Sequence, residues 1–143
     1  MNNRQAYFNY AIEDKFEAGV VLLGTEVKSI REGKVSFNDA FCLFDKHELW
    51  VRGLYIAEYK LGTTNNHIAV YDRKLLLHKK ELKKLEARMK ERGYSIIPLK
   101  VFFNDKELVK IEIGLGRGKK DHDKRQTIKE RDSKKEIKQY LLR

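Results

Sequence analysis

Three adjacent residues near the C-terminus, Asp121, His122 and Asp123, are the side chains of this 143-residue chain whose types could support catalysis. Two carboxylates and an imidazole can bind a metal ion or transfer protons. Adjacent residues of a flexible segment cannot hold such a geometry, however. The other histidines are scattered without metal-ligand spacing, and no nucleotide-binding or hydrolase motif is present. We therefore expect no enzyme, no metal and no cofactor; a nuclease built on these three residues is the enzymatic alternative.

Positive charge is concentrated in two blocks of the sequence. Residues 73–92 contain nine Lys and Arg against three Asp and Glu, and residues 115–143 contain eleven against five. The blocks together exceed the net charge of +10, so the remainder of the chain is slightly acidic. Two separate basic surfaces indicate two contact sites for the phosphates of a nucleic acid. The alternatives are a solvated helix face for the first block and a solubility tail for the second.

The remaining composition bounds the class of protein. The single cysteine, Cys42, excludes an internal disulfide framework and a cysteine-based zinc site, and it favours a cytosolic location. No apolar run approaches the roughly 18 residues of a membrane span, and the first ten residues lack the apolar core of a signal peptide. We expect a cytoplasmic protein that does not associate with membranes.

Short strands dominate the pattern up to residue 115. We predict strands over 16–23, 40–44, 49–56, 95–103 and 108–115, a short buried run at 75–77, and a polar loop over 59–72. Pro98 indicates a bulge or a sheet edge. Because the strands lack the alternation of a parallel sheet, we predict a mainly β fold with inserted helices: an OB-like antiparallel β-barrel.

Two helices are predicted between these strands. Thr25 can cap a short helix over 26–32. The clearer helix covers 79–92, where one face is apolar and the opposite face is rich in lysine; the apolar residues are Leu82, Leu85 and Met89. Lysines that outnumber their acidic neighbours favour phosphate contact over a merely solvated face.

We divide the chain into a barrel of residues 1–115 and a basic tail of residues 116–143. Residues 116–120 are predicted to form a flexible cationic hinge, and Thr127 to Glu130 fit a helix-start pattern. Such a tail can stay disordered alone and become helical on a polyanion. His122 could stack on a base there. In the barrel, Glu17 is either an acceptor for a base amino group or sugar hydroxyl, or an ordinary surface residue.

Three longer motifs resemble the signatures of the SsrA-binding protein family, also called small protein B. The first is FEAG at 16–19 followed by GTEVKSIREGK at 24–34. The second is RKLLLHK at 73–79. The third is GRGKK at 116–120, followed by HDKR at 122–125 and IKERD at 128–132. The motifs occur in the family's order and extend over the whole chain.

This resemblance implies a non-enzymatic, bacterial RNA-binding adaptor of trans-translation, the rescue of ribosomes stalled without a stop codon. Family members bind the tRNA-like domain of transfer-messenger RNA (tmRNA) and deliver it to the stalled ribosome. The resemblance implies an OB-like barrel and a tail that is disordered when free and helical in the empty mRNA channel. Elongation factor Tu and alanyl-tRNA synthetase act on the same RNA. A ribosomal structural protein that packs permanently on rRNA is the alternative from another class.

The same resemblance assigns residues to each partner. The RNA-binding face would comprise Asn3, Arg4, Glu17, Lys28, Arg73, Lys74, His78 and Lys79. The decoding centre and mRNA channel would be contacted by Lys119, Lys120, His122, Asp123, Lys124, Arg125, Lys129, Arg131, Lys134 and Lys135. Residues 75–77 would mix core packing with support of the RNA face. Two segments depart from the family pattern: the loop 66–72, and Gly114-Leu115-Gly116, whose glycines predict a looser hinge.

Overall fold

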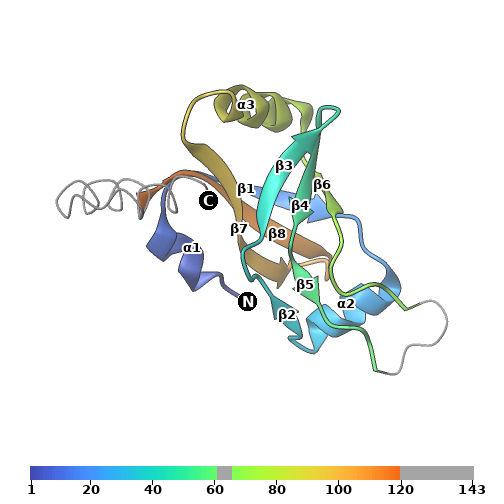
Figure 1. The fold of residues 1–143 in the computed structure, drawn as a ribbon. Helices are drawn as coiled ribbons and strands as arrows, with labels where there is room; N and C mark the ends of the chain where they lie inside the picture. Colours follow the sequence, from blue (N-terminus) through green and yellow to red (C-terminus); the bar gives the residue numbers. More distant parts are fainter. Residues whose placement is uncertain (61–65, 120–143) are drawn as a thin grey trace, which may run out of the picture.

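Six antiparallel strands close into a barrel in the computed structural model, which describes residues 1–60 and 66–119 (Figure 1). The barrel strands follow the order β1-β6-β4-β3-β7-β8. Their bounds are β1 Tyr10–Val20, β3 Phe41–Asp45, β4 Glu48–Arg52, β6 Arg73–Leu76, β7 Tyr94–Phe103 and β8 Val109–Gly118. A separate two-stranded sheet pairs β2, Val35–Ser36, with β5, Tyr55–Ile56. The predicted mainly β barrel with inserted helices is confirmed.

Among the described residues, three helices accompany the barrel: α1 Arg4–Asn9, α2 Gly24–Arg31 and α3 Lys79–Met89. In Figure 1, α3 lies at one end of the barrel and α2 at the other. The predicted apolar face of α3 is confirmed, because Leu85 is fully buried and Leu82 and Met89 pack against the barrel core. No helix in the part of the chain that the structure describes is long and apolar enough to cross a membrane.

The alternation predicted for β8 positions the core. Ile111, Ile113 and Leu115 are buried inside the barrel, while Lys110 and Glu112 between them are partly exposed. The predicted bulge at Pro98 is also confirmed, since the β7–β8 register shifts between Pro98 and Lys100. Period-two alternation therefore identified correctly which side of this hairpin faces inward.

Several elements differ from the prediction. The strand β1 begins at Tyr10, six residues before the predicted strand over 16–23, and the short strand β2 was not predicted. The predicted strand over 49–56 is divided into β4 and β5, because Gly53 adopts a positive φ of 85° that ends the extended conformation. The helix α1 was not predicted. It has only one buried residue, Ala6, and is held mainly through the residue before it, Asn3. Six residues with one apolar contact leave no periodic signal in the sequence.

The barrel also extends three residues past the predicted boundary at residue 115. Gly116 pairs with Ile12 of β1 and Ser95 of β7, and Gly118 pairs with Tyr10. Residues 116–118 are therefore a strand and not a flexible hinge. A glycine carries no inward or outward side chain, so the alternation that marks β8 fades where the strand continues.

Gly116 is required by close packing and not by flexibility. A Cβ atom added there would lie 2.5 Å from the carbonyl oxygen of Ala11, and one added at Gly114 would lie 2.7 Å from Leu99 Cδ1. The predicted looser hinge at these glycines is wrong, because each lets a neighbouring strand or side chain approach the backbone.

We expect Gly116→Ala to destabilise the fold by about 1–3 kcal/mol, because the overlap is with backbone that cannot rotate away. Gly24→Ala is the matched control, since nothing lies within 4 Å of its added Cβ. Unfolding in urea would measure both free energies. Equal stability of the two variants would show that β1 and β8 do not approach each other this closely.

Candidate nucleic-acid interface

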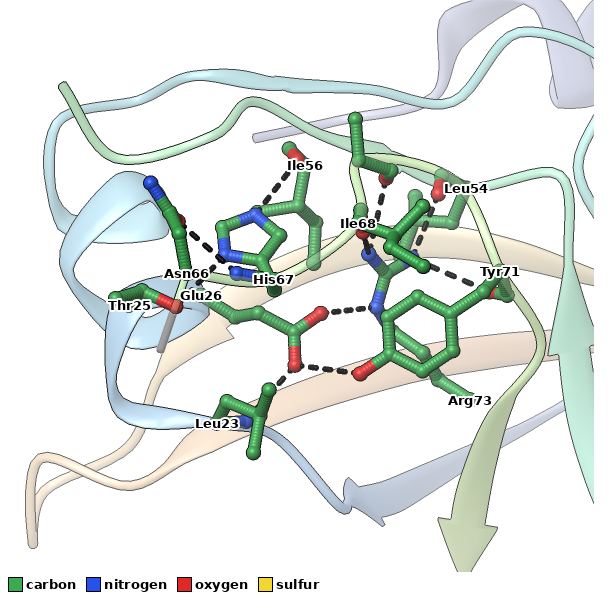
Figure 2. A network of polar contacts seen from close by, with 11 residues as sticks. Leu23, Thr25, Glu26, Leu54, Ile56, Asn66, His67, Ile68, Tyr71 and Arg73 are labelled. Atoms are coloured by element: carbon green, nitrogen blue, oxygen red, sulfur yellow. Dashed lines mark hydrogen bonds and ion pairs between the residues drawn. The ribbon is translucent and has the colours of Figure 1, made fainter. Parts of the chain in front are cut away.

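A buried ion pair joins the two motifs that resemble the family's first and second signatures. Glu26 of α2 shares a helix face with Ser29 and Ile30, and all three are buried. Its Oε2 atom accepts a hydrogen bond of 2.5 Å from Arg73 Nε at the start of β6 (Figure 2). Both side chains are fully inaccessible to solvent. The pair therefore connects α2 directly to the barrel.

The other carboxylate oxygen of Glu26 and the terminal nitrogens of Arg73 also form hydrogen bonds within the protein. Glu26 Oε1 accepts hydrogen bonds of 2.8 Å from the Leu23 backbone N–H and from the Tyr71 hydroxyl. The guanidinium nitrogens of Arg73 donate to backbone carbonyls, the two shorter bonds being to Leu54 at 2.7 Å and Ala69 at 3.0 Å. Removing two charges from water is costly unless their hydrogen bonds are replaced in this way.

The phenol of Tyr71 closes the pair on its outer side. The Arg73 guanidinium lies 4.4 Å from the centroid of the Tyr71 ring. Burial, followed by the hydrogen bond to Glu26, raises the pKa of Tyr71 above its ordinary value. The hydroxyl is therefore protonated at neutral pH and remains a donor to the Glu26 carboxylate.

A second polar network attaches the loop 66–72 to α2 and β5. The Nε2 atom of His67 bonds the Ile56 carbonyl at 2.9 Å, and its Nδ1 atom lies 2.8 Å from Thr25 Oγ1. A carbonyl only accepts, so Nε2 carries the proton. Asn66 bonds both backbone groups of Tyr59. This divergent loop thus has a structural role. The predicted cap at Thr25 is wrong: Leu23 is the N-cap of α2, and the Thr25 hydroxyl bonds His67 instead.

Two of the predicted RNA contacts are buried in the structure. Arg73 is 1% exposed, and Asn3 is 6% exposed. The Asn3 side chain accepts from the Ala6 N–H and donates to the Pro98 carbonyl at 2.8 Å, so it caps α1 and ties it to β7. The prediction that these two side chains touch RNA directly is at odds with their burial. Their bonds instead hold α1 on β7 and α2 on the barrel.

The other six predicted RNA contacts have accessible side chains. Lys74 is half-buried and forms an ion pair with Glu48. Lys28 lies on α2 with its Nζ 5.4 Å from the centroid of the Tyr59 ring. The exposed members are Arg4, Glu17, Lys28, His78 and Lys79. Within residues 1–60 and 66–119, no ion pair involves Lys79 or its neighbours Lys80 and Lys83, so three cations of α3 are available to phosphate.

The pairing of β1 with β6 brings part of this set together. Gly19 lies opposite Leu76, and the Val21 N–H bonds the Lys74 carbonyl. Arg4 lies apart from this group on α1, which packs against β1 and β7. The structure therefore places Lys74 beside the end of β1, the strand that carries Glu17, while His78 and Lys79 follow at the start of α3.

Residues 75–77 divide as the alternation of a strand requires. Leu75 is buried in the barrel, Leu77 packs against the core, and Leu76 is 49% exposed. Val21, which is 53% exposed, lies beside Lys74 of β6, to whose carbonyl its backbone N–H donates. Lys74 thus borders a small apolar surface, which suits contact with sugars and bases better than phosphate contact alone.

Ten predicted tail contacts and the Asp121-His122-Asp123 group concern the end of the chain. Of these, only Lys119 lies among the described residues, where it is exposed. The others, from Lys120 to Lys135, lie outside them, as does the group from Asp121 to Asp123. Among the described residues, no cluster of three or more histidine, cysteine or acidic side chains could hold a metal ion.

Sequence reasoning missed Glu26, His67 and Tyr71 as organising residues. A signal for Glu26 was available, since a carboxylate three and four residues from the buried Ser29 and Ile30 shares their helix face. His67 and Tyr71 carried no such signal, because they lie in a loop whose partners are distant in sequence. Charge and the family motif both pointed to Arg73, but neither could distinguish an exposed cation from a buried one.

We expect Glu26→Ala to cost about 3–5 kcal/mol, because it leaves the Arg73 guanidinium buried without a counter-ion. The double variant Glu26→Met/Arg73→Met should recover part of that loss. Asp72→Ala is the control: it breaks the half-exposed Arg52–Asp72 pair and should cost about 1 kcal/mol or less. Urea unfolding at pH 7 would compare them, and equal costs for Glu26→Ala and Asp72→Ala would show that the first pair is not buried.

Comparisons with known proteins agree on one family. The family model described as SmpB protein matches residues 1–143. The SsrA-binding protein of Parabacteroides distasonis is 52% identical over 137 residues, covering 96% of this chain and 90% of the relative. That of Bacteroides thetaiotaomicron is 48% identical over 143 residues, covering 100% and 95%.

A solved structure supports the same relationship. It is described as "tmRNA-SmpB: a journey to the center of the bacterial ribosome", superimposes with a TM-score of 0.71 at 44% sequence identity, and covers 83% of both chains. With a family model that spans its whole length and relatives about half identical to it, this chain belongs to the SmpB, or SsrA-binding protein, family.

Proposed function

We propose that this protein is a non-enzymatic RNA-binding adaptor of trans-translation. It binds the tRNA-like domain of tmRNA and delivers that RNA to stalled ribosomes. The observation that carries the proposal is the shared fold and 44% identity with a solved protein described as part of a tmRNA-SmpB assembly on the bacterial ribosome. The cations of α3 that form no ion pair among the described residues, and the accessible Lys74 of β6, fit the phosphate backbone that such a partner presents.

The RNA face has three kinds of contact. Lys28, Lys74 and Lys79 supply cations for phosphates, and Lys74 exchanges its pairing with Glu48 for a phosphate on binding. His78 offers an exposed ring that can stack on a base. Glu17 accepts from a base amino group or a ribose hydroxyl. Arg4 contacts the RNA from α1, and Arg73 and Asn3 act by holding these elements in place.

The basic tail acts at the ribosome. Lys119 leads into it from the end of β8, and His122 and Asp123 act at the decoding centre, with His122 stacking on a ribosomal base. The remaining cations contact rRNA phosphates at the decoding centre and along the empty mRNA channel: Lys120, Lys124, Arg125, Lys129, Arg131, Lys134 and Lys135. Elongation factor Tu and alanyl-tRNA synthetase associate functionally through the shared RNA, in the cytoplasm.

We expect Lys74→Ala/Lys79→Ala to reduce the salt dependence of binding to the isolated tRNA-like domain, its log–log slope falling by about two because two phosphate contacts are lost. Lys90→Ala/Arg92→Ala removes the same charge near the far end of α3 and should leave the slope unchanged. Titrations at several salt concentrations would measure both, with an elongator tRNA as competitor. Equal binding of tRNA and the tRNA-like domain would instead favour a general rRNA-binding protein.

We expect truncation after Lys119 to leave binding of the tRNA-like domain within about twofold, because β8 ends at Gly118 and the barrel stays complete. The same truncation should abolish tagging of peptides on stalled ribosomes in a reconstituted assay. Loss of RNA binding together with rescue would contradict the separation of the body from the tail.

A further inference from the structure

Four side chains meet on the outside of the barrel where β8 ends. The Tyr94 hydroxyl donates to Glu13 Oε1 at 2.8 Å and lies 2.5 Å from Arg88 Nη2. Glu13 also forms ion pairs with Arg88 at 3.5 Å and with Arg117 at 3.7 Å. The guanidinium carbons of Arg88 and Arg117 lie 4.6 Å and 4.4 Å from the centroid of the Tyr94 ring. We call this group the exit cluster.

Each member of the exit cluster comes from a different element. Tyr94 of β7 and Arg117 of β8 are direct cross-strand neighbours. Arg88 lies in the last turn of α3. Glu13 is the extra residue of a β-bulge, because Ile12 pairs with Gly116 and Asp14 pairs with Leu115. Bulges redirect a side chain out of the regular alternation, and here the redirected carboxylate contacts three residues.

A second contact holds the next residue from the other side. Lys119 Nζ donates to the Tyr7 carbonyl of α1 at 3.3 Å. Tyr7 in turn lies beside Lys15 of β1, whose Nζ is 5.3 Å from the Tyr7 ring centroid. The last two charged residues before Lys120 are thus attached to different neighbours, Arg117 to β1 and β7 and Lys119 to α1.

We propose that the exit cluster sets the direction in which the chain leaves the barrel, and so positions the basic tail relative to the RNA-binding face. This inference rests on the proposed function of that tail. The helix α3 carries His78 and Lys79 at one end and Arg88 at the other, and its 11 residues span about 16 Å. One helix therefore connects the RNA face to the start of the tail. Glu13, Tyr94 and Arg117 are positioning residues, because they fix the end of β8 relative to this helix without touching the RNA.

The charges of the cluster favour this role over a phosphate site. Both arginines are directed at the single carboxylate of Glu13 and at the Tyr94 ring, and Arg88 also pairs with Glu91 at 3.3 Å. Isolated surface ion pairs contribute little, but stacked and shared contacts act together. Keeping the last residues of β8 paired with β1 and β7 requires little free energy, and the combined contacts of four side chains are sufficient for it.

The test compares Glu13→Gln with Asp14→Asn. Both remove one carboxylate charge from β1, but Asp14 pairs with Lys84 of α3 and does not touch β8 through its side chain. In the free full-length protein, Glu13→Gln should increase hydrogen exchange at the amides of residues 117–119 about tenfold, with no change at Ile111 and Ile113. Asp14→Asn should leave both regions unchanged. Tyr94→Leu, which removes the ring and hydroxyl, is the second variant.

The functional arm uses the isolated tRNA-like domain and purified stalled ribosomes with tmRNA. Glu13→Gln and Tyr94→Leu should bind the RNA domain as the parent protein does and tag stalled peptides about tenfold more slowly. Unchanged exchange at residues 117–119, or faster exchange with normal tagging, would overturn the proposal. Altered affinity for the RNA domain would also overturn it, because the cluster would then act as an RNA contact. Failure of the parent protein to bind that RNA would refute the proposed function instead.

Discussion

The buried pair of Glu26 and Arg73 is the interaction on which the RNA-binding surface depends. Two full charges without solvent contact are tolerated only because a hydroxyl, a backbone amide and several carbonyls replace their hydration. Those partners belong to segments with little regular structure of their own, chiefly the residues around Leu54 and the loop 66–72. The pair thereby organises backbone that hydrophobic packing alone would leave unspecified. It places α2 against the barrel and fixes the position of the start of β6 relative to α2.

Neighbouring charged residues have opposite roles as a consequence. Arg73 points into the protein and Lys74 points outward, because adjacent residues of a strand face opposite sides. On α2, Glu26 faces inward while Lys28 is exposed on the opposite side of the helix. Each motif therefore combines a buried structural charge with an accessible one, and a single role cannot be assigned to the motif as a whole. A basic surface built in this way has a fixed shape, which recognition of a folded RNA requires.

The end of the barrel shows how backbone packing and surface charge cooperate. Gly116 lets β1 approach β8 closely, and the bulge beside it turns Glu13 towards Arg88, Tyr94 and Arg117. The glycines of this segment are consistent with rigidity, although in sequence they suggest the reverse. The basic tail therefore begins from an ordered strand.

Much of the fold could be predicted from the sequence because its signals are local. Alternation in Ile111, Ile113 and Leu115 identified a barrel strand, the spacing of Leu82, Leu85 and Met89 identified α3, and the order of the motifs identified the family. Other features depend on partners far apart in the chain. The burial of Arg73 follows from Glu26, 47 residues away, the attachment of Asn3 to β7 follows from Pro98, and the extent of β8 follows from β1. Period and charge describe a residue and its neighbours, whereas burial, pairing and register depend on which distant segment packs against it, and only the tertiary structure decides that.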